Sequence, residues 1–177
     1  MTVVVPDEFK YLYAQNDERP VVKYPAPVLL QKSLPVQKVS KKTVETIDQM
    51  LRIMKKANGI GLAAPQIGLL QRIIVMAPGG KTLALVNPVI TGKAGEQVRM
   101  EGCLSIPGLY GDVTRAAYVE VEAYDRRGRS VAFEMEGLAA QVIQHEIDHL
   151  DGVLFIDKVD LATVHWAHPE TEPTKAE

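Results

Sequence analysis

The sequence is poor in several features that would place a protein in a special class. Its 177 residues include a single cysteine, which excludes an internal disulfide and favours a reducing compartment. No apolar run approaches the roughly 20 residues of a membrane-spanning helix, and the first ten residues do not resemble a signal peptide. The formal net charge is only -2, so no excess of one sign indicates a nucleic-acid or membrane partner. These absences predict a cytoplasmic protein.

The composition and length predict one folded domain with a true core. Apolar residues make up 46% and charged residues 24% of the chain, which are the proportions of a globular domain. Residues 1–20 lack a clear period and are followed by several prolines, so we expect an extended N-terminal arm. The folded domain is expected at 21–164. Residues 165–177 are polar and interrupted by proline, which predicts a mobile C-terminal tail.

Two segments carry signals for helices. Apolar residues recur three and four positions apart in the first segment: Val44, Ile47, Leu51 and Met54. With Ser40 or Thr43 as a cap and Asn58-Gly59 as an exit, this spacing predicts an amphipathic helix towards the N-terminus. A second helix is expected to follow Gly137 and to end near Gly152.

Short runs rich in β-branched residues, separated by turn signals, predict strands. The runs cover residues 72–76, 83–87, 119–124 and 130–134, and the run 153–156 is also expected to return to a strand. Residues 125–129 read as the turn of a hairpin. The order of elements indicates an α+β fold, with antiparallel β-sheets packed around a central helix, plus the N-terminal amphipathic helix.

The most informative motif lies in the second predicted helix, where residues 144–149 read Q-H-E-I-D-H. Residues four apart share a helix face, so His145 and His149 can bind one metal ion while Glu146 lies beside an open coordination position. The alternative is that both histidines are ordinary core residues. It is less favoured because the glutamate stands where zinc enzymes of this pattern place a general base. The central helix is therefore predicted to bind metal.

A third metal ligand must come from elsewhere in the chain. The metzincin pattern requires a histidine where this chain has Phe155, which cannot be a ligand. Asp157 and Asp160 follow, but no further amphipathic helix is evident to hold them. Cys103 is the better candidate, because glycines and a proline around it favour a tight, exposed bend that can direct its sulfur at an ion. The alternative role for this cysteine is a small buried apolar residue.

The segment 59–68 needs separate consideration because it opens like a dinucleotide-binding fingerprint. It follows a helix instead of a strand, Pro65 interrupts the helix that should begin there, and no acidic residue occurs about 20 positions on. The nucleotide interpretation therefore fails. Gln66, the polar residue of this loop, can either satisfy the loop backbone or donate to an oxyanion in a hydrolase cleft.

Three segments together resemble the signatures of the peptide deformylase family. These enzymes remove the N-formyl group from the initiator methionine of new bacterial and organellar polypeptides. The signatures are G-x-G-x-A-A-x-Q, E-G-C-x-S and Q-H-E-x-D-H-x-x-G, and the chain has them in this order at 59–66, 101–105 and 144–152. The similarity extends over roughly residues 21–159.

The resemblance implies a role for each matching position. Cys103, His145 and His149 would be the metal ligands, and Glu146 would act first as general base and then as general acid. The side chain of Gln66 would form the oxyanion site together with one backbone group. That group is the N–H of Leu104.

The same resemblance implies the cofactor and the partners. One divalent ion is expected, Fe(II) in the cell, with zinc, nickel or cobalt able to occupy the same ligands. The substrates would be N-formyl-Met peptides of nascent chains in a bacterial cytoplasm. Some members dock a C-terminal helix on the ribosome, but the tail here is short and acidic, so only a transient ribosome association is expected. No nucleic-acid motif and no membrane contact are predicted.

The substrate pocket is predicted by analogy with the family. A slot for the methionine side chain is expected from four residues, which would equally suit an ordinary core: Ile60, Gly61, Leu138 and Val142. Tyr110 is also placed at the substrate, at a position where several members of the family have an arginine. Glu101 is expected to pair with Arg115 and so to brace the cysteine loop.

Two other functions remain open on the sequence alone. A metalloprotease of the H-E-x-x-H type would cleave internal peptide bonds and would not depend on Cys103. A non-catalytic protein would hold a structural ion in a closed site with four ligands and no exchangeable water, although no persuasive fourth ligand is evident.

Overall fold

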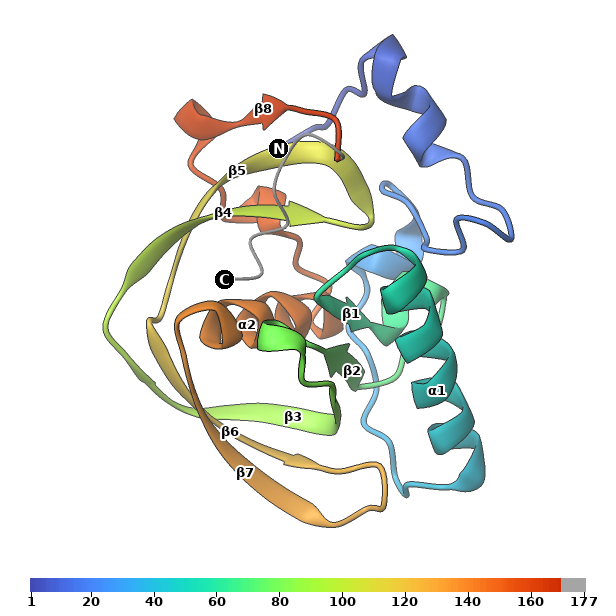
Figure 1. Ribbon diagram of the computed structural model, residues 1–177, viewed down its shortest axis with the longest axis vertical. Coiled ribbons are helices and arrows are strands. Elements are labelled where there is room, and N and C mark those ends of the chain that lie inside the picture. Colours follow the sequence, from blue (N-terminus) through green and yellow to red (C-terminus); the bar gives the residue numbers. More distant parts are fainter. Residues whose placement is uncertain (170–177) are drawn as a thin grey trace.

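The α+β fold expected from the sequence is confirmed by a computed structural model, which describes residues 1–169 (Figure 1). The α-helices are α1 Lys41–Lys56 and α2 Gly137–Leu150. The first sheet has the order β1-β2-β3-β6-β7, with β1 Gly61–Ala63, β2 Ile73–Met76, β3 Leu83–Ala94, β6 Tyr118–Tyr124 and β7 Ser130–Glu136. The second has the order β4-β5-β8, with β4 Gln97–Cys103, β5 Ile106–Arg115 and β8 His165–Trp166. Neighbouring strands in both sheets are antiparallel.

Strand β2 shows how the larger sheet is covered on both faces. All four of its residues are buried, and successive side chains of a strand point to opposite faces. Ile73 and Val75 pack in one apolar cluster with α1, whereas Ile74 and Met76 pack in another with α2. A strand covered on both sides reads as a continuous apolar run, which explains the uninterrupted I-I-V-M of this segment.

Helix α1 begins and ends where its sequence signals predicted. Ser40 is the N-cap, and its hydroxyl accepts a hydrogen bond from the backbone N–H of Thr43, as a capping residue does. The side chains of Ile47, Met50 and Met54 are buried against the sheet. Of the four predicted apolar positions, Ile47 and Met54 are therefore buried, whereas Val44 and Leu51 are only half-buried.

Helix α2 lies between the two sheets and carries the histidine motif (Figure 1). It contacts β1, β2, β6 and β7 of the larger sheet, while its histidines face the end of β4. The chain leaves the helix at Gly152, whose φ of +73° favours glycine. A Cβ atom there would also lie 2.8 Å from the backbone carbonyl of Leu30, so the exit is sterically restricted as well.

Parts of the predicted secondary structure differ from the observed one. Residues 61–63, which were expected in a loop, form strand β1. Strand β3 is longer than predicted, and β4 and β5 were not predicted as strands; the bend expected around Cys103 is the turn of the hairpin they form. The strand predicted at 153–156 was wrong, because the chain forms a 3₁₀ helix at Phe155–Asp157. There the carboxylate of Asp157 accepts the N–H of Leu154 at 3.0 Å, so a local cap replaces a strand ladder.

The two terminal segments are more structured than the sequence suggested. The arm contains a 3₁₀ helix at Asp7–Tyr13, with Phe9 buried, where an extended chain was expected. His165 and Trp166, the first two residues of the predicted tail, pair with β5 as β8. Residues 170–177 of that tail lie outside the described residues. Within residues 1–169 no helix has both the length and the apolar character needed to cross a bilayer.

Candidate metal centre and cleft

Helix α2 and strand β4 bring the three predicted metal ligands together. His145 and His149 lie one turn apart on α2, and Cys103 is the last residue of β4. Their ligand atoms all lie within 4.8 Å of one another, and the cysteine Sγ is 3.2 Å from Nε2 of His149. One thiolate and two imidazoles at this spacing suit a single borderline-soft divalent ion, so the residues present fit a metal.

The orientation of His145 is set by a buried carboxylate. Its Nδ1 lies 2.8 Å from Oε2 of Glu101, which leaves Nε2 as the nitrogen available to a metal. Arg115 donates to the same oxygen at 2.9 Å, so the predicted Glu101–Arg115 pair is confirmed. Gln141, which the sequence analysis missed, donates to the other oxygen of Glu101 at 3.0 Å. Gln141 lies one helical turn before His145, and this spacing could have indicated that both side chains share one face of the helix.

Glu101 and Arg115 form a buried ion pair. Burial alone would raise the pKa of Glu101, but hydrogen bonds from Arg115 and His145 hold it well below its usual range. Arg115 also donates to Asp148 of α2 at 2.8 Å, and Lys158 binds the same carboxylate. Because Arg115 belongs to β5, this network ties the smaller sheet to the metal-binding helix.

The thiol of Cys103 sits in surroundings that favour the thiolate. Burial raises the pKa of this thiol, but the nearby charges and hydrogen bonds of His149 and His145 hold it well below its usual value. The amide nitrogen of Gln66 lies 3.7 Å from the sulfur and donates to Ser105 at 3.2 Å. The amide oxygen of Gln66 accepts the N–H of Ala63 at 2.9 Å, which fixes the orientation of the amide with its N–H groups towards the cysteine.

Glu146 is buried beside the three ligands and packs against strand β1. A Cβ atom on Gly61 would lie only 2.2 Å from Oε1 of Glu146, so the glycine makes room for this carboxyl group. The other oxygen, Oε2, is buried and has no hydrogen-bond partner among the described residues. Burial raises the pKa of Glu146 to about 7, against the opposing charges of His145 and His149. A carboxyl group of this kind can exchange a proton near neutral pH.

A cleft of about 650 Å³ opens next to these groups, within the usual range for small-ligand sites. Cys103, His145, Glu146, Gln66 and Leu104 line it. All five residues predicted to contact substrate line it as well: Ile60, Gly61, Tyr110, Leu138 and Val142.

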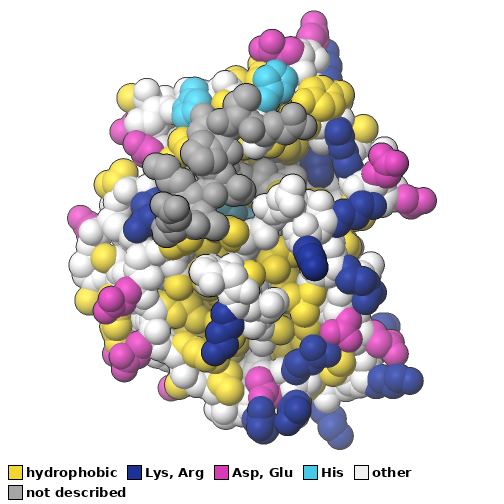
Figure 2. Space-filling view, in the orientation of Figure 1, with side chains coloured by type: hydrophobic (Ala, Val, Ile, Leu, Met, Phe, Trp, Pro, Cys, Tyr) yellow, Lys and Arg dark blue, Asp and Glu magenta, His cyan; other side chains and the backbone are white. Residues whose placement is uncertain are grey.

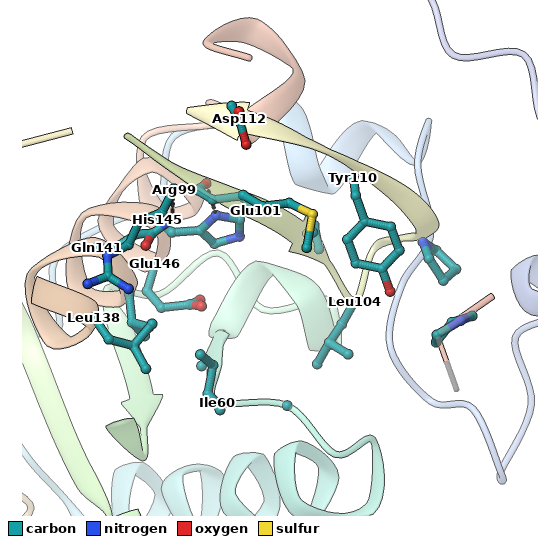
Figure 3. A pocket seen from close by; sticks show the side chains of 18 of the residues that line it. Ile60, Arg99, Glu101, Leu104, Tyr110, Asp112, Leu138, Gln141, His145 and Glu146 are labelled. Carbon is teal, nitrogen blue, oxygen red and sulfur yellow. Dashed lines mark hydrogen bonds and ion pairs between the residues drawn. The ribbon is translucent and has the colours of Figure 1, made fainter. Parts of the chain in front are cut away.

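The cleft has two differently built sides. In Figure 3, Leu138, Gln141, His145 and Glu146 project from the helix, and Tyr110 projects from a strand on the other side of the view. Arg99 and Asp112, which sequence reasoning did not single out, also line the cleft. Figure 2 shows hydrophobic side chains gathered near the centre of this face of the molecule, with charged side chains mainly at its edge. The site therefore joins a polar metal centre to an apolar surface.

An H-E-x-x-H helix, a candidate cysteine ligand from a separate strand and a buried carboxyl group beside an apolar cleft are the features of a metal-dependent hydrolase. The sequence profile of the polypeptide deformylase family matches residues 18–164. The chain belongs to this family, whose members are enzymes that hydrolyse N-formyl-Met peptides.

Individual relatives and solved structures agree with this assignment. The chain is 48% identical to the peptide deformylase of Desulfitobacterium hafniense over 138 residues, which cover 78% of this chain and 92% of the relative. It is 48% identical to peptide deformylase 1 of Bacillus subtilis over 141 residues, covering 78% and 88%. The crystal structure of the Thermotoga maritima peptide deformylase superposes with a TM-score of 0.78 at 40% identity, covering 79% of this chain and 96% of that one.

Proposed function

We propose that this chain removes the N-formyl group from the initiator methionine of newly made polypeptides in a bacterial cytoplasm and releases formate. The observation that carries the proposal is the grouping of Cys103, His145 and His149 around one point, with the Glu146 carboxyl group beside them at the cleft. Family membership supports formyl removal, and the geometry supports a hydrolytic mechanism.

The cofactor of the proposed reaction is one divalent ion held by Cys103, His145 and His149. We propose Fe(II) as the ion in the cell, with zinc, nickel or cobalt accepted by the same thiolate and imidazole ligands. When bound, such an ion lowers the pKa of a coordinated water towards neutrality and polarises a carbonyl oxygen. Glu101 would keep His145 in the tautomer that ligation needs, because it accepts from Nδ1.

Glu146 is the proton-transfer group in this proposal. Its carboxylate would remove a proton from the water that attacks the formyl carbon, and this role is supported by its lining the same cleft as His145 and Cys103. As the C–N bond breaks, the same group delivers the proton to the departing amine. Formyl-Met peptide and water thus become formate and a free N-terminal methionine, with no other reactant needed.

Two N–H donors would stabilise the negative charge that develops on the formyl oxygen. The amide of Gln66 is held by Ala63 and Ser105 with its nitrogen towards Cys103. Leu104 follows the cysteine in the turn between β4 and β5 and lines the same cleft, which supports its backbone N–H as the second donor. Donors fixed in advance cost no reorganisation when the oxyanion forms.

The apolar part of the cleft would hold the methionine side chain. The proposed slot consists of Ile60, Gly61, Leu138 and Val142. A formyl group carries only hydrogen on its carbonyl carbon, so close walls beside the ligands would exclude acetyl and longer acyl groups. Tyr110 would contact the substrate farther along the cleft. We place the catalytic unit at residues 21–164 and expect only transient association with the ribosome.

The decisive experiment is an anaerobic assay of Fe(II)-loaded protein on formyl-Met peptides, with acetyl-Met peptides as the control. We expect formate release from the former and none from the latter; equal rates on both would contradict the proposal. Replacing Cys103 with serine distinguishes the deformylase proposal from the metalloprotease alternative. The deformylase proposal predicts a loss of metal and activity in this variant, whereas the metalloprotease alternative predicts that both stay unchanged. A Glu146→Ala variant that lost its metal as completely as His145→Ala would instead favour a structural metal site.

A further inference from the structure

Residues on both sides of the family match form an aromatic cluster at one end of the molecule. The match covers residues 18–164, whereas Phe9 and Trp166 lie outside it. The ring centroids of Phe9 and Trp166 are 5.1 Å apart, and the ring of His168 stacks on Phe9 at 4.7 Å. The hydroxyl of Tyr11 lies 3.3 Å from Nδ1 of His168. We call Phe9, Tyr11, Trp166 and His168 the terminal cap.

The terminal cap packs directly on strand β5. Gly108 has a φ of +85°, and a Cβ atom there would lie 2.8 Å from the ring of Phe9, so the arm lies against the backbone of this strand. Phe9 is only 3% exposed although it belongs to an N-terminal arm. At the edge of β5 that is not paired with β4, Trp166 pairs with Leu109, and Ala167 donates to the carbonyl of Gly108 at 2.8 Å.

Tyr110 follows Leu109, the register partner of Trp166, and its own neighbours are Gly102 and His165. Its ring lies over Gly102, because a Cβ atom on that glycine would be 2.6 Å from a ring carbon. His165 of β8 is its partner in the sheet register, and their rings stack with centroids 6.1 Å apart. Gly102 directly precedes the cysteine ligand, so Tyr110 is held beside the strand that carries the metal centre.

The residue that follows the terminal cap lines the cleft. Pro169 follows His168 and lines the cleft together with Tyr110, Pro107 and Gly108. In Figure 3, Tyr110 projects from its strand with the ring directed towards Leu104, away from Leu138 on the helix. The methionine slot proposed above lies on the side of Ile60 and Leu138, which leaves the Tyr110 side for the rest of a bound peptide.

We propose that the terminal cap is a specificity element: it holds Tyr110 and Pro169 in place to contact the residues that follow formyl-methionine. The inference rests on the proposed deformylase function. An aromatic ring and a proline present apolar surface, so the substrate class is formyl-Met peptides with an aromatic or aliphatic residue at the second or third position. Phe9 and Trp166 act as positioning residues, because they contact β5 and β8 but do not line the cleft.

Steady-state kinetics on formyl-Met-Phe-Phe and formyl-Met-Ala-Ala test this role. We expect the Fe(II)-loaded wild-type chain to have the lower KM for the phenylalanine peptide. In Phe9→Ala that KM should rise at least about tenfold, while kcat and the KM for the alanine peptide stay within about twofold. Trp166→Ala should give the same split. In the double variant the KM for the phenylalanine peptide should be little higher than in either single variant, since both residues act through one contact.

Phe133→Ala is the matched control, because it removes the same side chain from β7 of the other sheet, where Phe133 packs in an apolar cluster that contains no residue of β5 or β8. The cluster includes residues of the proposed methionine slot, which both peptides share, so Phe133→Ala should lower stability and leave the ratio of the two KM values unchanged. Phe9→Leu, which keeps bulk but loses the ring, replaces Phe9→Ala if circular dichroism shows that the latter does not fold; a smaller rise in the same KM is expected.

Two results would overturn the inference. One is a folded Phe9 variant with wild-type KM on both peptides, and the other is an equal rise of KM on both, which would show a purely structural role. If the wild-type chain cleaves both peptides without preference, the inference is contradicted, but the proposed function is not. A wild-type chain that cleaves neither contradicts the proposed function instead.

Discussion

Gly61→Ala would test the placement of Glu146 without touching a metal ligand. The added Cβ atom would lie 2.2 Å from Oε1 of Glu146, 2.8 Å from its Cδ and 3.0 Å from its Cγ. Favourable separations between non-bonded carbon atoms are about 3.5–4.0 Å, so the carboxyl group must move by roughly 1 Å. The side chain is 4% exposed and belongs to the packed helix α2, so it has few other positions to adopt.

The expected loss of activity follows from the role proposed for this carboxyl group. A misplacement of 1 Å costs about 10²-fold, and loss of general acid–base catalysis costs about 10²- to 10⁴-fold. We therefore expect kcat of Gly61→Ala on a formyl-Met peptide to fall by at least about 10²-fold, which corresponds to about 3 kcal/mol of barrier. Metal content should stay at the wild-type value, because the atoms nearest to the added Cβ all belong to Glu146.

Gly92→Ala provides a matched control for this prediction. A Cβ atom on Gly92 would lie 2.6 Å from a carboxylate oxygen of Glu120, a similar clash between a strand glycine and a glutamate. Glu120 is exposed and can turn into solvent, so kcat should stay within about twofold of wild type. Formate release, metal analysis and urea unfolding of both variants complete the assay. A folded, metal-loaded Gly61→Ala enzyme with wild-type kcat would refute the reasoning.

Three further predictions concern stability and metal binding. Gly152→Ala should lower the free energy of unfolding by about 3 kcal/mol or more, because the strain of a left-handed backbone adds to a clash at 2.8 Å. Gly68 has a φ of +83° and nothing within 4 Å of an added Cβ atom, so Gly68→Ala should lower it by only about 1–2 kcal/mol. Equal losses in urea titrations would contradict this prediction. Arg115→Met should cost about 3–5 kcal/mol by the same measurement, because it removes the guanidinium that balances the buried charge of Glu101 and leaves only hydrogen bonds from Gln141 and His145. A loss below about 1 kcal/mol would disagree. Cys103→Ser should lose most of its bound metal in metal analysis after dialysis, and retention at the wild-type level would exclude the cysteine as a ligand.

The sequence was informative wherever a few neighbouring residues determine the outcome. Helix α1 was predicted with its cap at Ser40 or Thr43, and Ser40 is the cap, because capping and amphipathic periodicity depend on contacts within one or two turns. The β6–β7 hairpin was predicted for the same reason, and its turn is held by the Asp125 carboxylate, which accepts backbone N–H groups of Arg127 and Arg129. The candidate ligands were also identified from their residue types and spacing.

Strands β4 and β5 escaped prediction although residues 97–101 of β4 alternate between polar and apolar side chains. Gly102 and Gly111 interrupt both patterns, and each is needed because a neighbour occupies the place of a side chain: Tyr110 in one case and Val159 in the other. Such contacts join residues far apart in the chain, so no local pattern records them. The strand prediction for residues 153–156 was wrong because an apolar segment can bury its side chains without pairing as a strand.

The sequence by itself therefore determined the chemistry available to this protein: one thiol, two imidazoles on a helix face and a carboxyl group between them. Only the tertiary structure decided how that chemistry is arranged, with Glu101 orienting His145 and Gly61 accommodating Glu146. It also decided that both terminal segments pack on β5. The physical reason is that local propensity acts over a few residues, whereas burial and close packing act between any surfaces that the fold brings together.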